Sequence, residues 1–296
     1  MRILVTGRNG QLGRSIHKIV YEENKFNQST RHFVFVGREE LDLSNGNNIA
    51  HYFENNVFDV IINCAAYTAV DKAEKEKDLA NQVNCLAIRQ LAQIAKKQKA
   101  KLIHISTDYV FDGVSNYPYK ETDYTNPINI YGQTKLDGEK AIREIMPTDA
   151  IIIRTSWVYS EFGNNFVKTI LKLGREKDEI SVVNDQIGSP TYATDLADAI
   201  LAIIGTKEFK KNDQVMQIFH YSNEGELSWY EFAKEILKES KIDCEVNPIK
   251  TLEYPTPAKR PINTLLKKDK ILEFSDIKIH YWKKSIQACI KNINYK

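Results

Sequence analysis

A tyrosine and a lysine four residues apart, Tyr131 and Lys135, are the side chains whose types and spacing first suggest chemistry. In a helix, this spacing places both side chains on one face. An ammonium ion favours the ionised form of a neighbouring phenol, so we expect Lys135 to lower the pKa of Tyr131. Tyr131 could then pass a proton to the oxygen of a carbonyl group that is receiving hydride.

A strand expected at Leu102–Ser106 ends in polar residues shortly before this pair. Thr107 and Asp108 follow the strand directly, and the Thr107 hydroxyl can hydrogen-bond and orient the same carbonyl oxygen. A Tyr-x-x-x-Lys pair is common by chance, and its place after this strand end is what favours catalysis. His104 lies inside the strand, where we expect it in the core or behind the catalytic residues.

Three glycines, Gly7, Gly10 and Gly13, lie between the first apolar run and the first helical pattern. They permit a tight turn, a close backbone approach to a pyrophosphate and close packing of helix on strand. Free N–H groups at the start of the helix can bind phosphate without a large basic charge. The turn therefore predicts a dinucleotide site, and its Gly-x-x-Gly-x-x-Gly spacing resembles that of extended short-chain dehydrogenases.

The second apolar run ends at Gly37 and Arg38. An NAD-selective site normally carries a carboxylate at this point for the ribose 2′-hydroxyl, and that acid is absent. Arg38 could instead face a 2′-phosphate, which favours NADPH, with NADH as the alternative cofactor. A solvated Arg38 without a ligand is the other interpretation.

The first half of the chain alternates short apolar runs with longer amphipathic stretches, the clearest of which is Leu79–Lys97. This alternation predicts an α/β fold of the Rossmann type, with a doubly wound parallel sheet and ligands at the carboxyl ends of its strands. The expected strands are Ile3–Thr6, His32–Val36, Val60–Cys64, Leu102–Ser106 and Ala150–Arg154.

The pattern becomes less regular after about Trp157. We expect residues 1–156 to form a dinucleotide-binding domain, to which segments near 193–214 return. Residues 157–296 are expected to form mainly a smaller C-terminal α/β substrate-binding domain. The expected helices there are Asn165–Glu176, Asp195–Ile204, Trp229–Ser240 and Trp282–Ile293, and the proline-rich Tyr254–Pro261 is expected to be a loop.

The composition argues against a nucleic-acid-binding, membrane or secreted protein. The 296 residues carry 41 basic and 39 acidic side chains, and a net charge of +2 provides no basic surface for nucleic acid or an anionic membrane. No apolar run is long enough for a signal peptide or a membrane span. The cysteines are scattered, which favours reduced thiols in a cytoplasmic protein and no metal site. They are Cys64, Cys85, Cys244 and Cys289.

Together with several longer strings, these residues resemble the dTDP-4-dehydrorhamnose reductases over nearly the whole chain. The glycine and Tyr-x-x-x-Lys motifs mark only the superfamily, whereas Ala66–Glu74 and Arg154–Tyr159 are much more particular. The strings that carry the resemblance are Thr6–Gly13, Cys64–Glu74, Ser106–Gly113, Tyr131–Lys135, Arg154–Tyr159, Gly163–Val167, Asn184–Thr191 and Pro257–Pro261.

The resemblance implies NAD(P)H-dependent reduction of the C4 keto group of dTDP-4-dehydro-L-rhamnose in the synthesis of dTDP-rhamnose for surface polysaccharide. It implies that Tyr131 donates the proton and that Lys135 holds the nicotinamide ribose. Thr107 and Asp108 are expected to contact the sugar, with Trp157 stacked near it. The residues expected along the cofactor are Gly10, Gln11, Leu12, Asp42, Leu43, Ala65, Ala66, Tyr67 and Thr68.

Arg260, in the proline-flanked loop, is a candidate for a forked contact with the substrate pyrophosphate. A surface arginine, or one that closes the fold, is the alternative. The segment Tyr21–Arg31 is long for the family. Some members bind Mg²⁺ and dimerise; a homodimer is therefore possible, but we map no metal ligands.

Two other functions remain open. The first is an epimerase or dehydratase of the same superfamily that acts on another nucleotide sugar and retains tightly bound NAD. The second is a non-catalytic regulatory subunit, because a protein of this fold binds the enzyme that makes S-adenosylmethionine. Thr107, Tyr131 and Lys135 argue against the second function, since a binding protein needs no catalytic residues.

Overall fold

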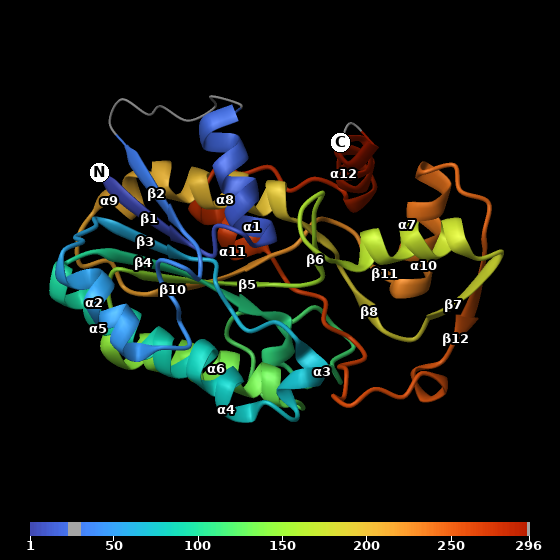
Figure 1. Cartoon of the computed structure of the whole chain (residues 1–296), viewed down its shortest axis with the longest axis horizontal. Helices are drawn as coiled ribbons and strands as arrows, with labels where there is room; N and C mark the ends of the chain where they lie inside the picture. The colour runs from blue at the N-terminus through green and yellow to red at the C-terminus, as the bar shows by residue number, and fades with distance from the viewer. Residues whose placement is uncertain (23–30, 295–296) are drawn as a thin grey trace.

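A parallel sheet of six strands organises the larger part of the molecule, in the order β10-β5-β4-β3-β1-β2 (Figure 1). The computed structural model describes residues 1–22 and 31–294, so most of the long segment Tyr21–Arg31 lies outside the described residues. The strands are β1 (Arg2–Thr6), β2 (His32–Val36), β3 (Val60–Asn63), β4 (Lys101–Thr107), β5 (Ala150–Thr155) and β10 (Gln217–Tyr221). The predicted Rossmann-type sheet is confirmed.

Helices cover both faces of this sheet (Figure 1). Alternate residues along each strand point to opposite faces, so Leu4 and Ile61 belong to one apolar core and Val5 and Ile62 to the other. One face carries α1 (Gln11–His17), α8 (Ala193–Gly205), α9 (Lys207–Lys210) and α11 (Asp269–Phe274). The other carries α2 (Gly46–Glu54), α4 (Lys77–Asn81), α5 (Ala87–Gln98) and α6 (Ile130–Ile145).

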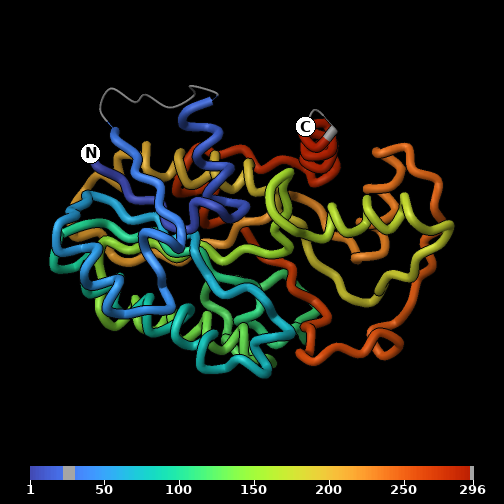
Figure 2. Tube along the Cα trace, viewed as in Figure 1, coloured from blue at the N-terminus to red at the C-terminus, as the bar shows by residue number. Residues whose placement is uncertain are grey.

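A smaller unit lies beyond the carboxyl ends of the strands and has an apolar core of its own, which includes Val167, Phe232 and Trp282 (Figure 1). We propose that it forms the substrate domain. The chain enters this unit more than once, since α8, β10 and α11 all pack with the large sheet (Figure 2). Its elements are α7 (Phe166–Glu176), β7 (Glu179–Val183), α10 (Trp229–Glu239), β12 (Glu245–Ile249) and α12 (Trp282–Asn294).

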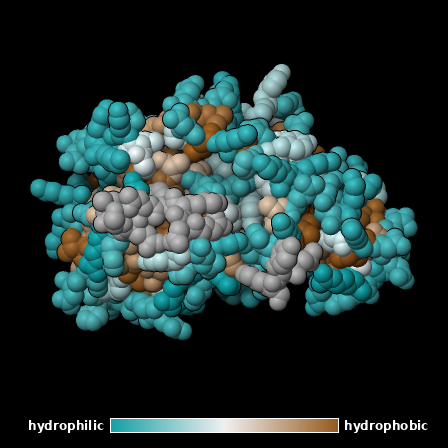
Figure 3. Space-filling model, turned by 90° about the horizontal axis from the view of Figure 1, so that it is seen from above, coloured by the Kyte–Doolittle hydropathy of each residue, from teal (hydrophilic) through white to brown (hydrophobic). Residues whose placement is uncertain are grey.

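Short elements connect these layers. The π-helical turn η1 extends α1, and the 3₁₀ turns η3 and η4 follow β4 and β12. Within the described residues, no helix has the length and apolarity needed to cross a membrane. In Figure 3, hydrophilic side chains cover most of the visible face, and the apolar atoms there form separate patches. The remaining short elements are η1 (Lys18–Glu22), α3 (Val70–Ala73), η3 (Asp108–Val110), β6 (Val158–Tyr159), β8 (Ile187–Gly188), β9 (Thr191–Tyr192), β11 (Leu227–Ser228) and η4 (Thr251–Glu253).

The helix predicted at Leu79–Lys97 is interrupted by a π-helical turn, η2 (Gln82–Leu86), between α4 and α5. The turn carries the buried Asn84, whose side chain accepts a hydrogen bond from the Tyr67 N–H and donates one to the Tyr67 carbonyl. Such turns occur often at functional sites. Here the turn ties α5 to the segment that follows β3.

Helix α6 begins where the Asn129 side chain accepts a hydrogen bond from the Gly132 N–H, at 2.8 Å. Its central glycine, Gly138, packs directly against η2. A Cβ atom at this position would come within 2.2 Å of the Asn84 carbonyl oxygen. Gly138 therefore sets the distance between α6 and the turn that holds Tyr67.

We expect Gly138→Ala to lower the free energy of unfolding by about 1–3 kcal/mol, because the added methyl group meets backbone that cannot yield. Gly205→Ala is the matched control, since no atom lies within 4 Å of a Cβ added there. Urea denaturation followed by circular dichroism measures both. Equal stability of the two variants would show that α6 and η2 can separate at no cost.

Candidate active site

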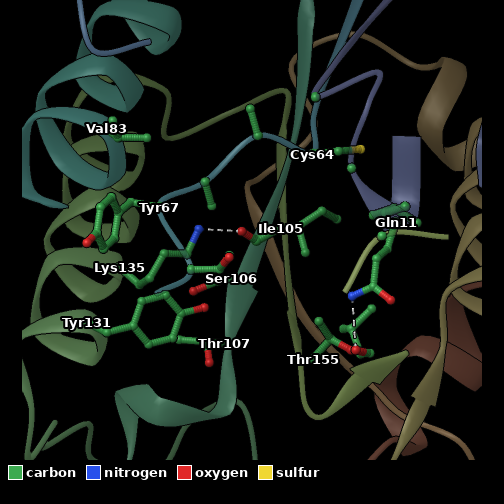
Figure 4. A pocket seen from close by; sticks show the side chains of 18 of the residues that line it. Gln11, Cys64, Tyr67, Val83, Ile105, Ser106, Thr107, Tyr131, Lys135 and Thr155 are labelled. Carbon is green, nitrogen blue, oxygen red and sulfur yellow. Dashed lines mark hydrogen bonds between the residues drawn. The ribbon is translucent and has the colours of Figure 1, made fainter. Parts of the chain in front are cut away.

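A cavity of about 870 Å³ opens at the carboxyl ends of the parallel strands, between the sheet and the smaller unit. Figure 4 shows Tyr131, Lys135 and Thr107 on one side of it and Gln11 on the other. Its walls come from the glycine turn, the ends of β2 to β5, α6, and residues of α8 and α10. Because consecutive parallel strands end at the same edge, residues distant in sequence converge here.

The structure brings most of the residues expected from the sequence to this cavity. Two of them, Gly13 and Arg260, do not line it. Those that do are Gly7, Gly10, Gln11, Leu12, Arg38, Asp42, Leu43, Ala65, Ala66, Tyr67, Thr68, Thr107, Asp108, Tyr131, Lys135 and Trp157.

The glycine turn has no room for side chains at two of its positions. Gly7 has a φ of +71°, and a Cβ there would lie 2.9 Å from the Ala65 nitrogen. A Cβ at Gly13 would lie 2.3 Å from the Gly7 carbonyl oxygen. Gly13 therefore lies behind the turn and permits α1 to pack against it, while Gly7 and Gly10 leave backbone exposed to a ligand.

Arg38 lies at the rim of the cavity, with 75% of its side chain exposed. Its Nε atom is 3.3 Å from the Asp42 carboxylate, and the Ser44 hydroxyl donates to the same carboxylate at 2.7 Å. The guanidinium is thus held loosely at the end of β2. Its remaining donors are available to an anionic group that enters the cavity.

Tyr131 differs from the expectation for its pKa. Burial raises the pKa to about 12, the Thr107 hydroxyl opposes the increase, and the Asp108 carboxylate adds to it. Lys135 does not lower this pKa, because its Nζ atom is engaged elsewhere. The phenol is therefore firmly protonated at neutral pH.

The Lys135 amine lies beneath Tyr131, only 1% exposed. Nζ donates to the Ile105 carbonyl oxygen at 2.6 Å, as Figure 4 marks, and lies 3.2 Å from His104 Nε2. Burial lowers the pKa of Lys135 to about 8, although the charge of Glu139 raises it. His104 is fully buried behind the catalytic residues.

Thr107 ends β4 and caps η3, because its Oγ1 accepts a hydrogen bond from the Tyr109 N–H at 3.1 Å. The hydroxyl itself donates to Asp108 Oδ1 at 3.0 Å. Burial raises the pKa of Asp108 to about 6, although the hydrogen bond from Thr107 lowers it. A threonine hydroxyl and a carboxyl group thus lie next to Tyr131 on the cavity wall.

Sequence reasoning missed a buried ion pair behind this wall. Arg154 donates to both carboxylate oxygens of Glu139, with Nη2 at 2.7 Å from Oε2, and each side chain is at most 2% exposed. Ser106, which lines the cavity, donates to the same carboxylate at 2.5 Å. The position of Ser106 at the end of a strand could have indicated that it lines the site. No sequence feature near Glu139 indicates its role.

Two tryptophans stack where the smaller unit meets the cavity. The rings of Trp157 and Trp229 are 3.6 Å apart and nearly parallel, at 13°. Trp157 has a φ of +47°, which is strained for a bulky residue, and a Cβ at Gly188 would come within 2.8 Å of its ring. Trp229 was not expected here, because its approach depends on tertiary packing.

The glycine turn is also fastened to the smaller unit. Gln11 donates from its amide to the Val158 carbonyl at 3.2 Å, and Asn165 donates to the Gln11 amide oxygen at 2.9 Å. Gln11 therefore links the cofactor side of the cavity to the loop before α7. Other residues that line the cavity without having been expected include Asn9, Cys64, Ile105, Gly163, Asn164 and Leu196.

Arg260 makes its forked contact with protein. Its two terminal nitrogens donate to the two oxygens of Asp71 at 2.6 and 2.7 Å, and 18% of the side chain is exposed. Asn129 donates to the Lys259 carbonyl beside it. The Pro257–Pro261 loop is thereby closed onto α3 and the start of α6.

Comparison with known proteins now identifies the family. The model of the RmlD substrate binding domain family matches residues 1–295. The chain belongs to this family. It is 40% identical to the dTDP-4-dehydrorhamnose reductase of Aggregatibacter actinomycetemcomitans, over 99% of this chain and 98% of that protein.

Solved structures of the family superpose closely on this chain. The dTDP-4-dehydrorhamnose reductase of Clostridium acetobutylicum has a TM-score of 0.90 and 40% identity, covering 99% of this chain and 100% of its own. That of Bacillus anthracis, in complex with NADP, has a TM-score of 0.89 and 37% identity, covering 98% and 99%. Among the residues described here, no group of three or more His, Cys, Asp or Glu side chains is arranged to hold a metal ion.

We expect Asp108→Asn to stabilise the protein at about pH 8 by at most about 3 kcal/mol, because it removes a buried charge. The pKa of Asp108 is higher in the folded protein than its usual value, so the ionised group destabilises the fold above about pH 6. This penalty disappears as the pH falls below the usual value, and the two proteins should converge at about pH 4. Urea unfolding at both pH values measures the difference.

Asp112→Asn is the matched control, with the opposite sign. Hydrogen bonds from Tyr119 and Asn126 outweigh burial and lower the pKa of Asp112, so its loss should destabilise the protein at alkaline pH. A less stable Asp108→Asn protein at about pH 8 would contradict the charge penalty assigned to Asp108.

Proposed function

We propose that this protein uses NADPH to reduce the C4 keto group of dTDP-4-dehydro-L-rhamnose and so forms dTDP-L-rhamnose. Full-length similarity to proteins with this name supports the substrate. The observation that carries the reaction type is the half-buried Tyr131 phenol, which lines the same cavity wall as Thr107 and Lys135, and this cavity begins at the glycine turn.

The cavity has the features that a dinucleotide requires. Gly7 and Gly10 leave the backbone of the first turn open to a pyrophosphate, and Ala65, Ala66 and Tyr67 continue this wall after β3. Arg38 offers a cation at the rim, which suits the 2′-phosphate of NADPH, and NADH is the alternative. When bound, the nicotinamide supplies the hydride for the carbonyl carbon.

Tyr131 supplies the proton. Reduction of a ketone places negative charge on the carbonyl oxygen, and a nearby O–H donor stabilises this charge as it develops. A phenol whose pKa is raised to about 12 stays protonated before the substrate binds. It can therefore act as the general acid in the reduction. The Thr107 hydroxyl lies beside it and donates to Asp108 Oδ1, so it must turn its proton away from that carboxylate to hydrogen-bond the same oxygen.

Lys135 and Asp108 complete the polar wall. As an ammonium ion, Lys135 donates hydrogen bonds to the ribose hydroxyls of the cofactor. Asp108 accepts from Thr107, which fixes that hydroxyl next to the sugar. Trp157 offers an aromatic face to the substrate. Arg260 can reach the pyrophosphate only by leaving Asp71.

We place the reaction in the cytoplasm, which suits a protein whose four cysteines are all free thiols. A homodimer is also a proposal, made on family resemblance alone. The cavity is lined by this chain, and the proposed chemistry uses residues of one protomer.

The proposed function predicts consumption of one NADPH per dTDP-L-rhamnose when dTDP-4-dehydro-L-rhamnose is generated in situ. Tyr131→Phe should lower turnover by more than ~100-fold, because the proton donor is lost, while NADPH still binds. Absorbance at the nicotinamide band measures turnover, and quenching of protein fluorescence measures binding. Tyr109→Phe, which changes the neighbouring ring, should lose far less activity.

Near-normal turnover by Tyr131→Phe would contradict the assignment of the proton donor. If the folded wild-type protein binds NADPH but consumes none, the reductase proposal fails. Tightly bound NAD after purification would then point to an epimerase, and its absence to a binding protein.

A further inference from the structure

A row of buried polar residues crosses the face of the sheet beneath α5 and α6. Thr6 of β1 pairs with Asn63 of β3, and Asn63 pairs with His104 of β4. All three side chains are at most 1% exposed. We call Thr6, Asn63 and His104 the polar row; two residues earlier on the same strands, the register partners Leu4, Ile61 and Leu102 are all apolar.

Hydrogen bonds run along the polar row from the glycine turn to Lys135. Thr6 Oγ1 is 2.6 Å from Asn63 Oδ1, and Asn63 Nδ2 is 3.0 Å from His104 Nδ1. His104 Nε2 is 3.2 Å from Lys135 Nζ. The residue that precedes Gly7 is therefore connected to the buried lysine through two side chains.

Backbone groups determine which way the Asn63 amide points. The Ala65 N–H donates to Thr6 Oγ1 at 3.2 Å, which leaves the Thr6 proton for Asn63 Oδ1. The Ala65 carbonyl can only accept, and it lies 3.3 Å from the other side of the amide. That side must therefore be the NH₂ group, and the same group faces His104.

The direction of this hydrogen bond selects the tautomer of His104. Burial is the main cause that keeps the pKa of His104 well below its usual range, so the imidazole is neutral and carries one proton. Since Nδ1 accepts from Asn63, the proton lies on Nε2. Nε2–H then points at Lys135 Nζ, which donates in turn to the Ile105 carbonyl at 2.6 Å.

We propose that His104 is a positioning residue which donates from Nε2–H to the uncharged amine of Lys135 and thereby stabilises that form relative to the ammonium ion. An ammonium ion has no lone pair to accept this hydrogen bond. Protonation of Lys135 must therefore break its contact with His104. The polar row holds the amine in place, and Lys135 is released from His104 when it becomes charged.

The other ionisable groups around Lys135 are few. Glu139, one turn further along α6, favours the charged amine, but its carboxylate is bound by Arg154 of β5. Tyr131 of α6 is protonated, and the charge of Asp108, after β4, raises the pKa of Tyr131. Cys64, after β3, is neutral, because burial raises the pKa of its thiol. His104 is thus the neighbour whose hydrogen bond opposes the charge.

The tautomer can be observed directly by NMR of the whole protein labelled with ¹⁵N-histidine. The His104 resonances are assigned from the spectrum of His104→Gln. We expect the Nε2–H tautomer, no imidazolium at mildly acidic pH, and a shift of Nε2 as Lys135 titrates that is absent in Lys135→Met. An Nδ1–H tautomer or a protonated ring would overturn the proposal, whatever reaction the protein catalyses.

The kinetic consequence rests on the proposed function and is measured separately, by the pH dependence of kcat/KM for NADPH oxidation. The glutamine of His104→Gln can turn its amide oxygen toward Nζ and accept from the ammonium ion. The alkaline limb of the profile, set by Lys135, should therefore move upward by about one pH unit. A limb that stays in place or moves downward would contradict the direction assigned to the hydrogen bond.

His220→Gln is the matched control. His220 is a second fully buried histidine, on β10 of the same sheet, and its Nδ1 faces the Tyr119 carbonyl instead of Lys135. This variant also replaces a neutral imidazole by an amide, so it reports the general cost of the substitution. It should leave the alkaline limb unchanged, and an equal shift in both variants would assign the effect to stability alone.

Discussion

The parallel register of β1, β3 and β4 is the constraint on which the cavity depends. It aligns Thr6, Asn63 and His104 as direct partners, so that one line of hydrogen bonds joins the glycine turn to Lys135. A slip of one residue in any strand would turn this line to the opposite face. The cofactor side and the catalytic side of the cavity are therefore positioned by the same backbone ladder.

Burial then decides how the catalytic pair behaves. It raises the pKa of Tyr131 to about 12 and lowers that of Lys135 to about 8, so it disfavours the charged form of each group. An uncharged phenol can donate its proton when negative charge develops on a substrate oxygen. Behind them, Arg154 holds the Glu139 carboxylate through its Nε and Nη2 atoms.

The parallel sheet and its first five strands along the chain could be predicted because periodicity and β-branched runs are local signals. The Tyr131–Lys135 pair was predictable for the same reason, since helical spacing places both on one face. The partner of Arg260 and the stack of Trp157 on Trp229 were not, because they depend on which segments meet in space. The contact between His104 and Lys135 was not predicted either, because the residues next to His104 in the sequence do not indicate which helix packs on its strand.

The proposed reduction delivers hydride to C4 of the sugar and a proton to the oxygen on C4 within this cavity. It is tested most directly with NADPH that carries deuterium on the transferred position of the nicotinamide. The account predicts dTDP-L-rhamnose with one deuterium, bound to C4, and none at other ring carbons. A product without deuterium at C4, or deuterium returned to the cofactor with no net oxidation, would contradict it.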